Sequence, residues 1–65
     1  MKTEYMGFKP GDRIELIHMN DSHAVPAGTK GTIDHIDDIG QLHMKWDNGR
    51  ALAVDLDVDT VKKIK

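Results

Sequence analysis

Apolar and polar residues alternate along several short runs of the chain, and each run is bounded by residues that favour turns. In the clearest run, Leu42, Met44 and Trp46 fall on one face and His43 and Lys45 on the other. A repeat of two residues is typical of a β-strand with one buried face. The pattern therefore predicts a strand here, with its apolar side chains in the core.

The same pattern predicts four further strands. They span residues 13–19, 30–36, 50–54 and 60–65. Ile17 interrupts the alternation of the first, which indicates either a bulge or an end of the strand that is buried on both sides. Gly31 indicates a bulge or a sharp bend in the second. Asn48-Gly49 is the strongest short-range hairpin signal, so the chain turns back directly after Trp46.

The segments between the strands have the composition of turns and loops. Residues 20–29 are predicted to form one long loop, 37–40 a tight turn, and 55–59 a single 3-10 turn. Residues 1–8 show no sustained period and are interpreted as a flexible lead-in. The remaining residues, 9–65, have the layout of a small all-β domain, a five-stranded SH3-like barrel.

The length and composition limit what the chain can be. Its 65 residues allow one domain with a thin core, and the absence of cysteine excludes disulfides and thiolate zinc sites. No apolar run approaches the roughly 20 residues that span a bilayer, and the first residues lack the apolar stretch of a secretory signal. We therefore expect a cytoplasmic protein that does not contact membranes.

The net charge indicates which class of partner the chain binds. At −2 the chain lacks the excess of Lys and Arg that proteins usually need to bind phosphates. A protein partner is therefore favoured over a nucleic acid.

Catalysis has little support in the sequence. The only serine, Ser22, lies in the long loop beside Asp21 and His23. Neighbours in a loop do not form a catalytic triad, whose members must be held by a rigid scaffold. No glycine-rich motif that cradles phosphate is present either. We predict that the protein is not an enzyme and uses no cofactor.

Four histidines, His18, His23, His35 and His43, allow a zinc or nickel site as one interpretation, with carboxylates nearby in the sequence at Asp21, Asp34 and Asp37. Their irregular spacing includes no helical pair, so solvent-facing histidines without a metal are the favoured interpretation. If a metal were bound, His35 and His43 would be its ligands, because a tight turn joins their two strands and the two side chains could face each other outward.

Two other features have a functional and a structural interpretation. Asp55, Asp57 and Asp59 alternate like the start of an EF-hand loop, but the glycine and the closing glutamate of that motif are missing. Solvated turn carboxylates are therefore favoured. Trp46 could stack on a base or anchor a peptide, but its alternation with Leu42 and Met44 favours the core.

The predicted function is that of a non-enzymatic interaction module, monomeric, which contacts a protein through the long loop and the outer strand face. The candidate binding residues are Lys30, His43, Lys45, Arg50, Asp21 and His23. The alternative is a nucleic-acid-binding accessory domain that acts through a basic patch of Lys30, Lys45 and Arg50. Ordinary mixed surface charge is the structural interpretation of that patch.

Three stretches carry a resemblance to known proteins: KPGDRIEL at 9–16, PAGTKGTI at 26–33 and IDDIGQLHMKWDNGR at 36–50. They are similar to a family of small bacterial and phage domains of unassigned function that are built on an SH3-like barrel. Residues 28–36 also resemble the KOW-type element of ribosomal and transcription-elongation proteins, in which the adjoining loops touch RNA or protein. The resemblance implies a fold and no activity, and it assigns no functional residues.

Overall fold

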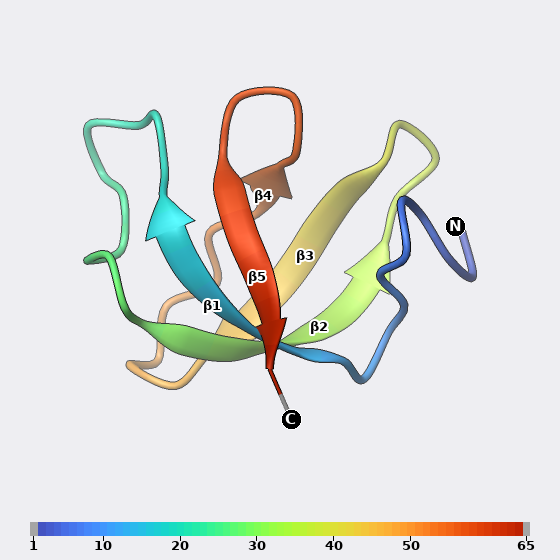
Figure 1. Ribbon diagram of the computed structural model, residues 1–65, viewed down its shortest axis with the longest axis horizontal. Helices are drawn as coiled ribbons and strands as arrows, with labels where there is room; N and C mark the ends of the chain where they lie inside the picture. Colours follow the sequence, from blue (N-terminus) through green and yellow to red (C-terminus); the bar gives the residue numbers. More distant parts are fainter. Residues whose placement is uncertain (1, 65) are drawn as a thin grey trace.

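Five antiparallel strands form one sheet in the computed structural model, which describes residues 2–64 (Figure 1). The strands are β1 (Arg13–His18), β2 (Lys30–Ile36), β3 (Gln41–Trp46), β4 (Val54–Asp55) and β5 (Thr60–Ile64). They lie in the order β4-β3-β2-β1-β5, and residues 2–64 contain no helix. The predicted all-β class is confirmed. The strand order is compatible with a small SH3-like barrel, although the sheet is not closed and β4 and β5 form its two edges.

The inner face of the sheet carries the hydrophobic core. The buried apolar side chains are Ile14, Leu16, Met19, Val25, Ile33, Ile36, Leu42, Met44, Trp46 and Val54. Leu42, Met44 and Trp46 all lie inward, so the orientation predicted for this strand is confirmed. Trp46 is 3% exposed, and its indole N–H donates a hydrogen bond to the carbonyl of Leu52 at 2.8 Å, which satisfies the one polar atom of the ring.

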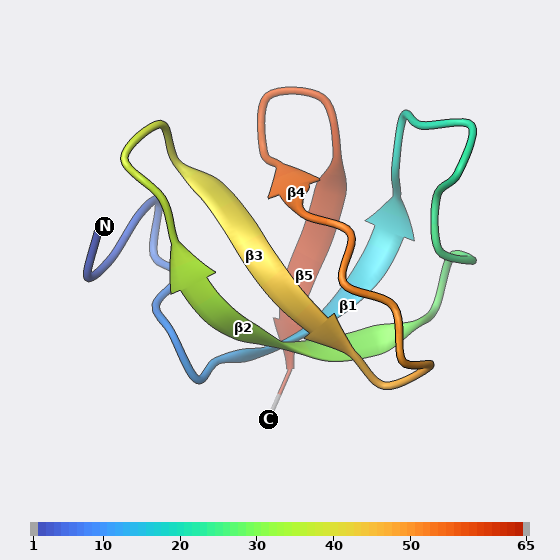
Figure 2. The ribbon, with the colours of Figure 1, turned by 180° about the vertical axis from the view of Figure 1, so that it is seen from behind.

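The fourth strand is shorter than predicted, because the ladder predicted from residue 50 to 54 is interrupted. The backbone N–H of Trp46 donates to the carbonyl of Arg50 at 3.0 Å, and Leu42 pairs with Val54. Between these points the Leu52 carbonyl accepts the indole N–H. Figure 2 shows the chain turning after β3 and returning to β4 as an irregular segment.

The pairing of β1 with β5 shows an irregularity that the sequence predicted. The pairing of β1 with β5 shifts between Leu16 and His18, so the bulge expected at Ile17 is confirmed. Ile17 is 43% exposed there, whereas Leu16 is buried. The bulge therefore turns one apolar side chain out of the core.

Gly31 allows close packing and does not form a bulge. The register of β2 with β3 is regular at Gly31, which pairs with Trp46, and shifts further along, between Ile33 and His35. A Cβ atom on residue 31 would lie 2.8 Å from Cε3 of Trp46. The bulge proposed at Gly31 is therefore wrong, and glycine is needed because the indole lies directly against the backbone.

Residues 2–8, the predicted lead-in, contact the sheet at several points. The N–H of Lys2 donates to the carbonyl of Ile36 at 2.8 Å, and Tyr5 and Phe8 pair through two backbone hydrogen bonds of 2.8 and 2.9 Å. Both rings pack against the core, and Lys63 Nζ donates to the carbonyl of Gly7 at 2.7 Å. Met1, in the lead-in, and Lys65, in the predicted last strand, lie outside the described residues.

A buried carboxylate joins the loops at one end of the sheet. Asp59 is 9% exposed, so the interpretation of this residue as a solvated turn carboxylate is wrong. Its carboxylate accepts hydrogen bonds from the N–H groups of Asn20 at 2.9 Å and Asp55 at 3.0 Å. The N–H groups of Val58 and Asp59 both donate to the carbonyl of Asp55. The single turn predicted before the last strand is therefore present as a hydrogen-bonded turn at residues 56–58, too short to form a 3-10 helix.

Candidate functional site

The outer face of β2 and β3 gathers polar side chains, because the residues that alternate with the core point outward. The antiparallel register places Thr32 opposite Lys45 and His35 opposite His43. The bulge after Ile33 leaves both Asp34 and His35 outside the core. Titratable groups from two strands therefore lie side by side on this face.

His35 and His43 stack on each other. Their ring centroids are 4.3 Å apart and the ring planes differ by 8°. Each side chain is 36% exposed, so the pair lies at the surface and not in the core. The two histidines singled out from the sequence as facing each other do so in the structure.

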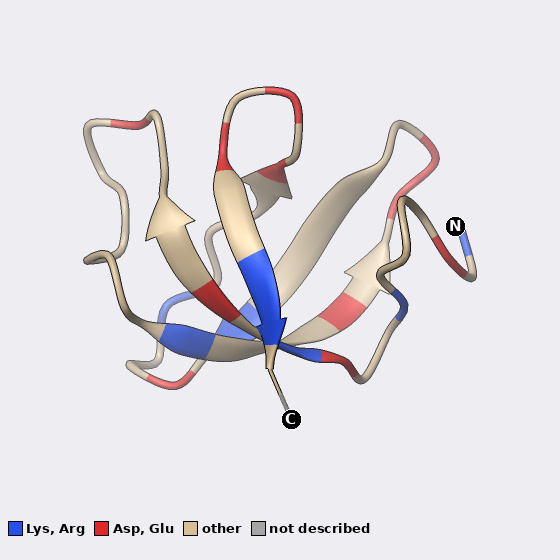
Figure 3. Ribbon diagram, in the orientation of Figure 1, with Lys and Arg blue, Asp and Glu red and all other residues tan. Residues whose placement is uncertain are grey.

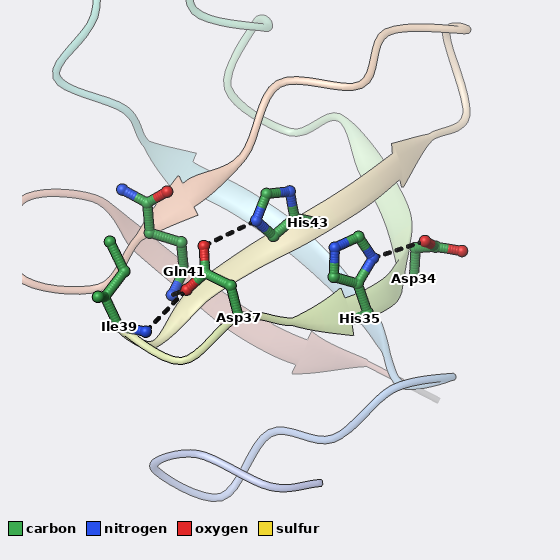
Figure 4. A network of polar contacts seen from close by, with 6 residues as sticks. All are labelled: Asp34, His35, Asp37, Ile39, Gln41 and His43. Atoms are coloured by element: carbon green, nitrogen blue, oxygen red, sulfur yellow. Dashed lines mark hydrogen bonds and ion pairs between the residues drawn. The ribbon is translucent and has the colours of Figure 1, made fainter. Parts of the chain in front are cut away.

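Each ring of the histidine pair also contacts its own carboxylate (Figure 4). Nδ1 of His35 lies 2.8 Å from Oδ2 of Asp34, and Nε2 of His43 lies 2.8 Å from Oδ2 of Asp37. The hydrogen bond from His35 is the main cause that lowers the pKa of Asp34, and the bond from His43 does the same for Asp37. Both carboxylates are thereby held in the charged form.

The β2–β3 turn positions Asp37. Besides His43, its carboxylate accepts hydrogen bonds from the backbone N–H groups of Ile39 at 3.1 Å and Gln41 at 2.9 Å. These bonds also lower the pKa of Asp37, because they favour its charged form. The carboxylate is therefore fixed by the turn, and through it one ring of the histidine pair.

Lys45 completes this group. Its Nζ lies 3.5 Å from Oδ1 of Asp34, and its side chain is 78% exposed. The outer face of β2 and β3 thus carries one lysine, two histidines and two carboxylates in contact. We call Asp34, His35, Asp37, His43 and Lys45 the histidine cluster.

A second ion pair lies on the same face, toward the other end of the strands. Arg13 donates two hydrogen bonds to the carboxylate of Asp47, each 2.7 Å long, and a third to Thr32 Oγ1 at 3.1 Å. The bond to Asp47 is the main cause that raises the pKa of Arg13, and the bond from Arg13 is the main cause that lowers the pKa of Asp47. The two-pronged geometry suits a guanidinium and a carboxylate. Lys30, opposite Glu15 in the β1–β2 register, adds to the lowering of the pKa of Asp47.

Arg50 lies apart from the histidine cluster. Its guanidinium donates a hydrogen bond to the carbonyl of His23, which ties the β3–β4 connection to the long loop. Within that loop, the carboxylate of Asp21 accepts a hydrogen bond from the N–H of His23 at 2.7 Å.

The structure divides the six predicted binding residues into separate groups. His43 and Lys45 belong to the histidine cluster, Arg50, His23 and Asp21 form a corner at the loop, and Lys30 lies on the outer face near Asp47.

Sequence reasoning missed two parts of this surface. Arg13 and Asp47 are 34 positions apart, and no local pattern links them. Asp34 and Asp37 were noted only as carboxylates near histidines, and the bulge that turns Asp34 and His35 outward together was not predicted. The signal for the bulge is the three-residue spacing of Ile33 and Ile36, both of which are buried.

The charges are unevenly distributed over the molecule (Figure 3). Three connections that reach the upper edge of that view, residues 19–29, 37–40 and 56–59, contain aspartates and no Lys or Arg. Most Lys and Arg of residues 2–64 lie on the strands, and the others are Lys2 and Lys9 before β1 and Arg50 in the β3–β4 connection. Residues 2–64 enclose no pocket, and no three of their His, Asp or Glu side chains converge where they could hold a metal ion. No helix that could cross a membrane is found in the same residues.

Comparison with known protein families gives a match over nearly the whole chain. The model of a family described as "Domain of unknown function (DUF4314)" matches residues 1–64, which includes the lead-in. No curated protein and no solved structure matches the chain.

Proposed function

Because the chain belongs to DUF4314, a family whose description names no activity, we propose from its surface that it is a non-enzymatic module that binds another protein. The contact surface is the outer face of β2 and β3, with Lys30 and the histidine cluster, together with the corner at Asp21, His23 and Arg50. The proposal includes a cytoplasmic location, supported by the absence of cysteine from the sequence. Bacterial or phage origin stays a prediction from the resemblance.

One observation carries this proposal: three cations on the outer side of the sheet are paired with carboxylates of the same chain. Lys45 lies 3.5 Å from Asp34, Arg13 lies 2.7 Å from Asp47, and Lys62 lies 3.9 Å from Glu15. The face therefore presents adjacent charges of both signs. Such a mosaic is suited to a protein surface with a complementary arrangement of charges.

The same pairing disfavours the nucleic-acid alternative. A protein that binds phosphates gains affinity by releasing counterions from them, which requires cations that are free to replace those counterions. On the outer side of the sheet three cations already contact a carboxylate, and the whole chain has a net charge of −2. The KOW-type alternative therefore depends on Lys30 and Arg50 more than on the face as a whole.

The first test is a titration of isotope-labelled protein with single-stranded RNA and with duplex DNA, at low and at moderate salt. We expect no change in the amide spectrum. Shifts that cluster at residues 30, 43, 45 and 50 and fade with salt would favour the nucleic-acid alternative.

The second test compares the proteins captured by three forms of the domain: wild type, the double variant Lys45→Glu/Arg50→Glu, and Asp57→Asn as a surface control. A direct partner should be retained by wild type and by Asp57→Asn and be lost with the double variant. Equal retention by all three would remove the outer face from the proposed contact surface. Because both residues of the double variant are exposed, we expect it to stay folded, as its amide spectrum would show.

A further inference from the structure

The histidine cluster has features of a metal site that the sequence alone did not support. Three observations bear on it: the distance between the two rings, the carboxylate on each ring, and the local charge. Each concerns residues that contact one another across β2 and β3.

The first observation is the separation of the rings. Two nitrogens bound to one first-row metal ion lie about 3–4 Å apart, because each metal–nitrogen bond is about 2.0–2.1 Å long. The centroids of His35 and His43 are 4.3 Å apart, so one nitrogen of each ring can approach the other closely enough to reach the same ion. The rings are nearly parallel, so a shared ion needs one of them to turn about its Cβ–Cγ bond. The ring of His35 has room to do so, because its own side chain is 36% exposed and that of its partner Asp34 is 43% exposed, whereas Asp37 holds the ring of His43 in place.

The second observation is the hydrogen bond on each ring. A carboxylate accepts a proton from the ring nitrogen that it contacts, so Nδ1 of His35 and Nε2 of His43 are the donors. In the neutral rings, the lone pairs therefore lie on Nε2 of His35 and Nδ1 of His43. In Figure 4 the carboxylates lie on the far sides of the two rings, and these remaining nitrogens lie between them. Histidines that bind metals typically donate their other N–H in this way.

The third observation is the local charge. Asp34 and Asp37 contact the rings, and Lys45 is the one cation in contact with the cluster among the described residues. Two carboxylates and one ammonium leave a net negative charge beside the lone pairs. This favours a cation over an anion as the ligand.

We propose that His35 and His43 form a surface site for a late first-row divalent metal ion, with Asp34 and Asp37 orienting the two rings and water filling the other positions. Imidazole ligands suit copper, nickel and zinc, and affinity for such sites follows the order in which Cu²⁺ exceeds Ni²⁺ and Zn²⁺. With only two protein ligands, the bound ion exchanges with ions in solution. Mg²⁺ and Ca²⁺ prefer oxygen ligands and should not bind.

The test uses Cu²⁺ as a paramagnetic probe and Ni²⁺ in calorimetry, with untagged protein. We expect Cu²⁺ to broaden the amide signals around residues 35 and 43 first, and a chelator to restore them. Calorimetry should give one Ni²⁺ per chain. The variant His43→Asn should weaken Ni²⁺ binding by about tenfold or more, and His18→Asn/His23→Asn, the matched control, should leave it unchanged.

A second variant separates orientation from ligation. Asp34→Asn keeps the shape of its side chain and lies outside the β2–β3 turn, so the fold is retained while the ring of His35 loses its charged partner. Ni²⁺ affinity should fall by about tenfold, the order found for groups that orient a ligand. The proposal is overturned if neither ion binds, if the signals near His18 and His23 broaden first, or if His35→Asn/His43→Asn binds Ni²⁺ as tightly as wild type.

Discussion

The two faces of β2 and β3 are built from the same strands but are held in different ways. On the inner face, Ile33, Met44 and Trp46 are at most 3% exposed, and their neighbours fit so closely that residue 31 has no space for a side chain. On the outer face, Lys45 is 78% exposed and its contact with Asp34 is open to solvent. Burial of apolar surface stabilises the fold, whereas exposed ion pairs contribute little.

This difference indicates where function can reside. A residue of the inner face cannot change without affecting packing, so its identity reports on the fold. A residue of the outer face can change without affecting the packing of the core. The stability of the sheet therefore does not explain why the stacked histidines and the paired charges are present.

The largest expected effect comes from Trp46→Ala on the inner face. Loss of a large buried aromatic costs about 3–5 kcal/mol, which approaches the whole stability of a small domain. Urea unfolding followed by circular dichroism would measure it, and amide dispersion would show whether the variant folds. The adjacent outer-face variant Lys45→Ala is the matched control, and it should change the free energy of unfolding by less than about 0.5 kcal/mol. A well-folded Trp46→Ala protein would contradict the inward position of the indole.

A smaller effect is expected for Gly31→Ala. The added Cβ would lie 2.8 Å from the Trp46 ring and 3.0 Å from the carbonyl oxygen of Lys45, so one of them must shift. Overpacking of this kind costs about 1–3 kcal/mol. Repeating the substitution in a Trp46→Phe background should reduce its cost, because the smaller ring leaves space. An equal cost in both backgrounds would show that the indole is not what excludes a side chain at residue 31.

The smallest effect is expected on the outer face, from Asp47→Asn. Because Arg13 lowers the pKa of Asp47 in the folded state, the pair adds stability above the usual aspartate value of 3.8 and loses it as the pH falls through the lower folded value. The variant should therefore be slightly less stable than wild type at neutral pH and equal to it at strongly acidic pH. Thermal unfolding across this range would measure the difference. Asp57→Asn serves as the control, and the same pH dependence in both variants would argue against a specific role of Arg13.

The sequence predicted the inner face better than the outer one. Alternation identified the orientation of Leu42, Met44 and Trp46, because a buried face leaves a pattern in neighbouring residues. Alternation also predicted a fourth strand that is too long. The hydrogen bond from the indole to Leu52 interrupts the ladder there, and as a tertiary contact it leaves no local pattern. The pairing of Arg13 with Asp47 was missed because it depends on how the strands meet. The bulge between Ile33 and His35 was also missed, although the spacing of Ile33 and Ile36 indicates it. His35 and His43 were found together because a tight turn joins their strands.

The backbone hydrogen bond between Lys2 and Ile36 has a practical consequence for handling the protein. It fixes the second residue of the chain beside the end of β2, one residue from His35. A polyhistidine purification tag placed ahead of this residue would begin close to the end of β2 and supply competing imidazoles. A tag after residue 64, or one removed by a protease, keeps the added histidines away from that edge of the sheet.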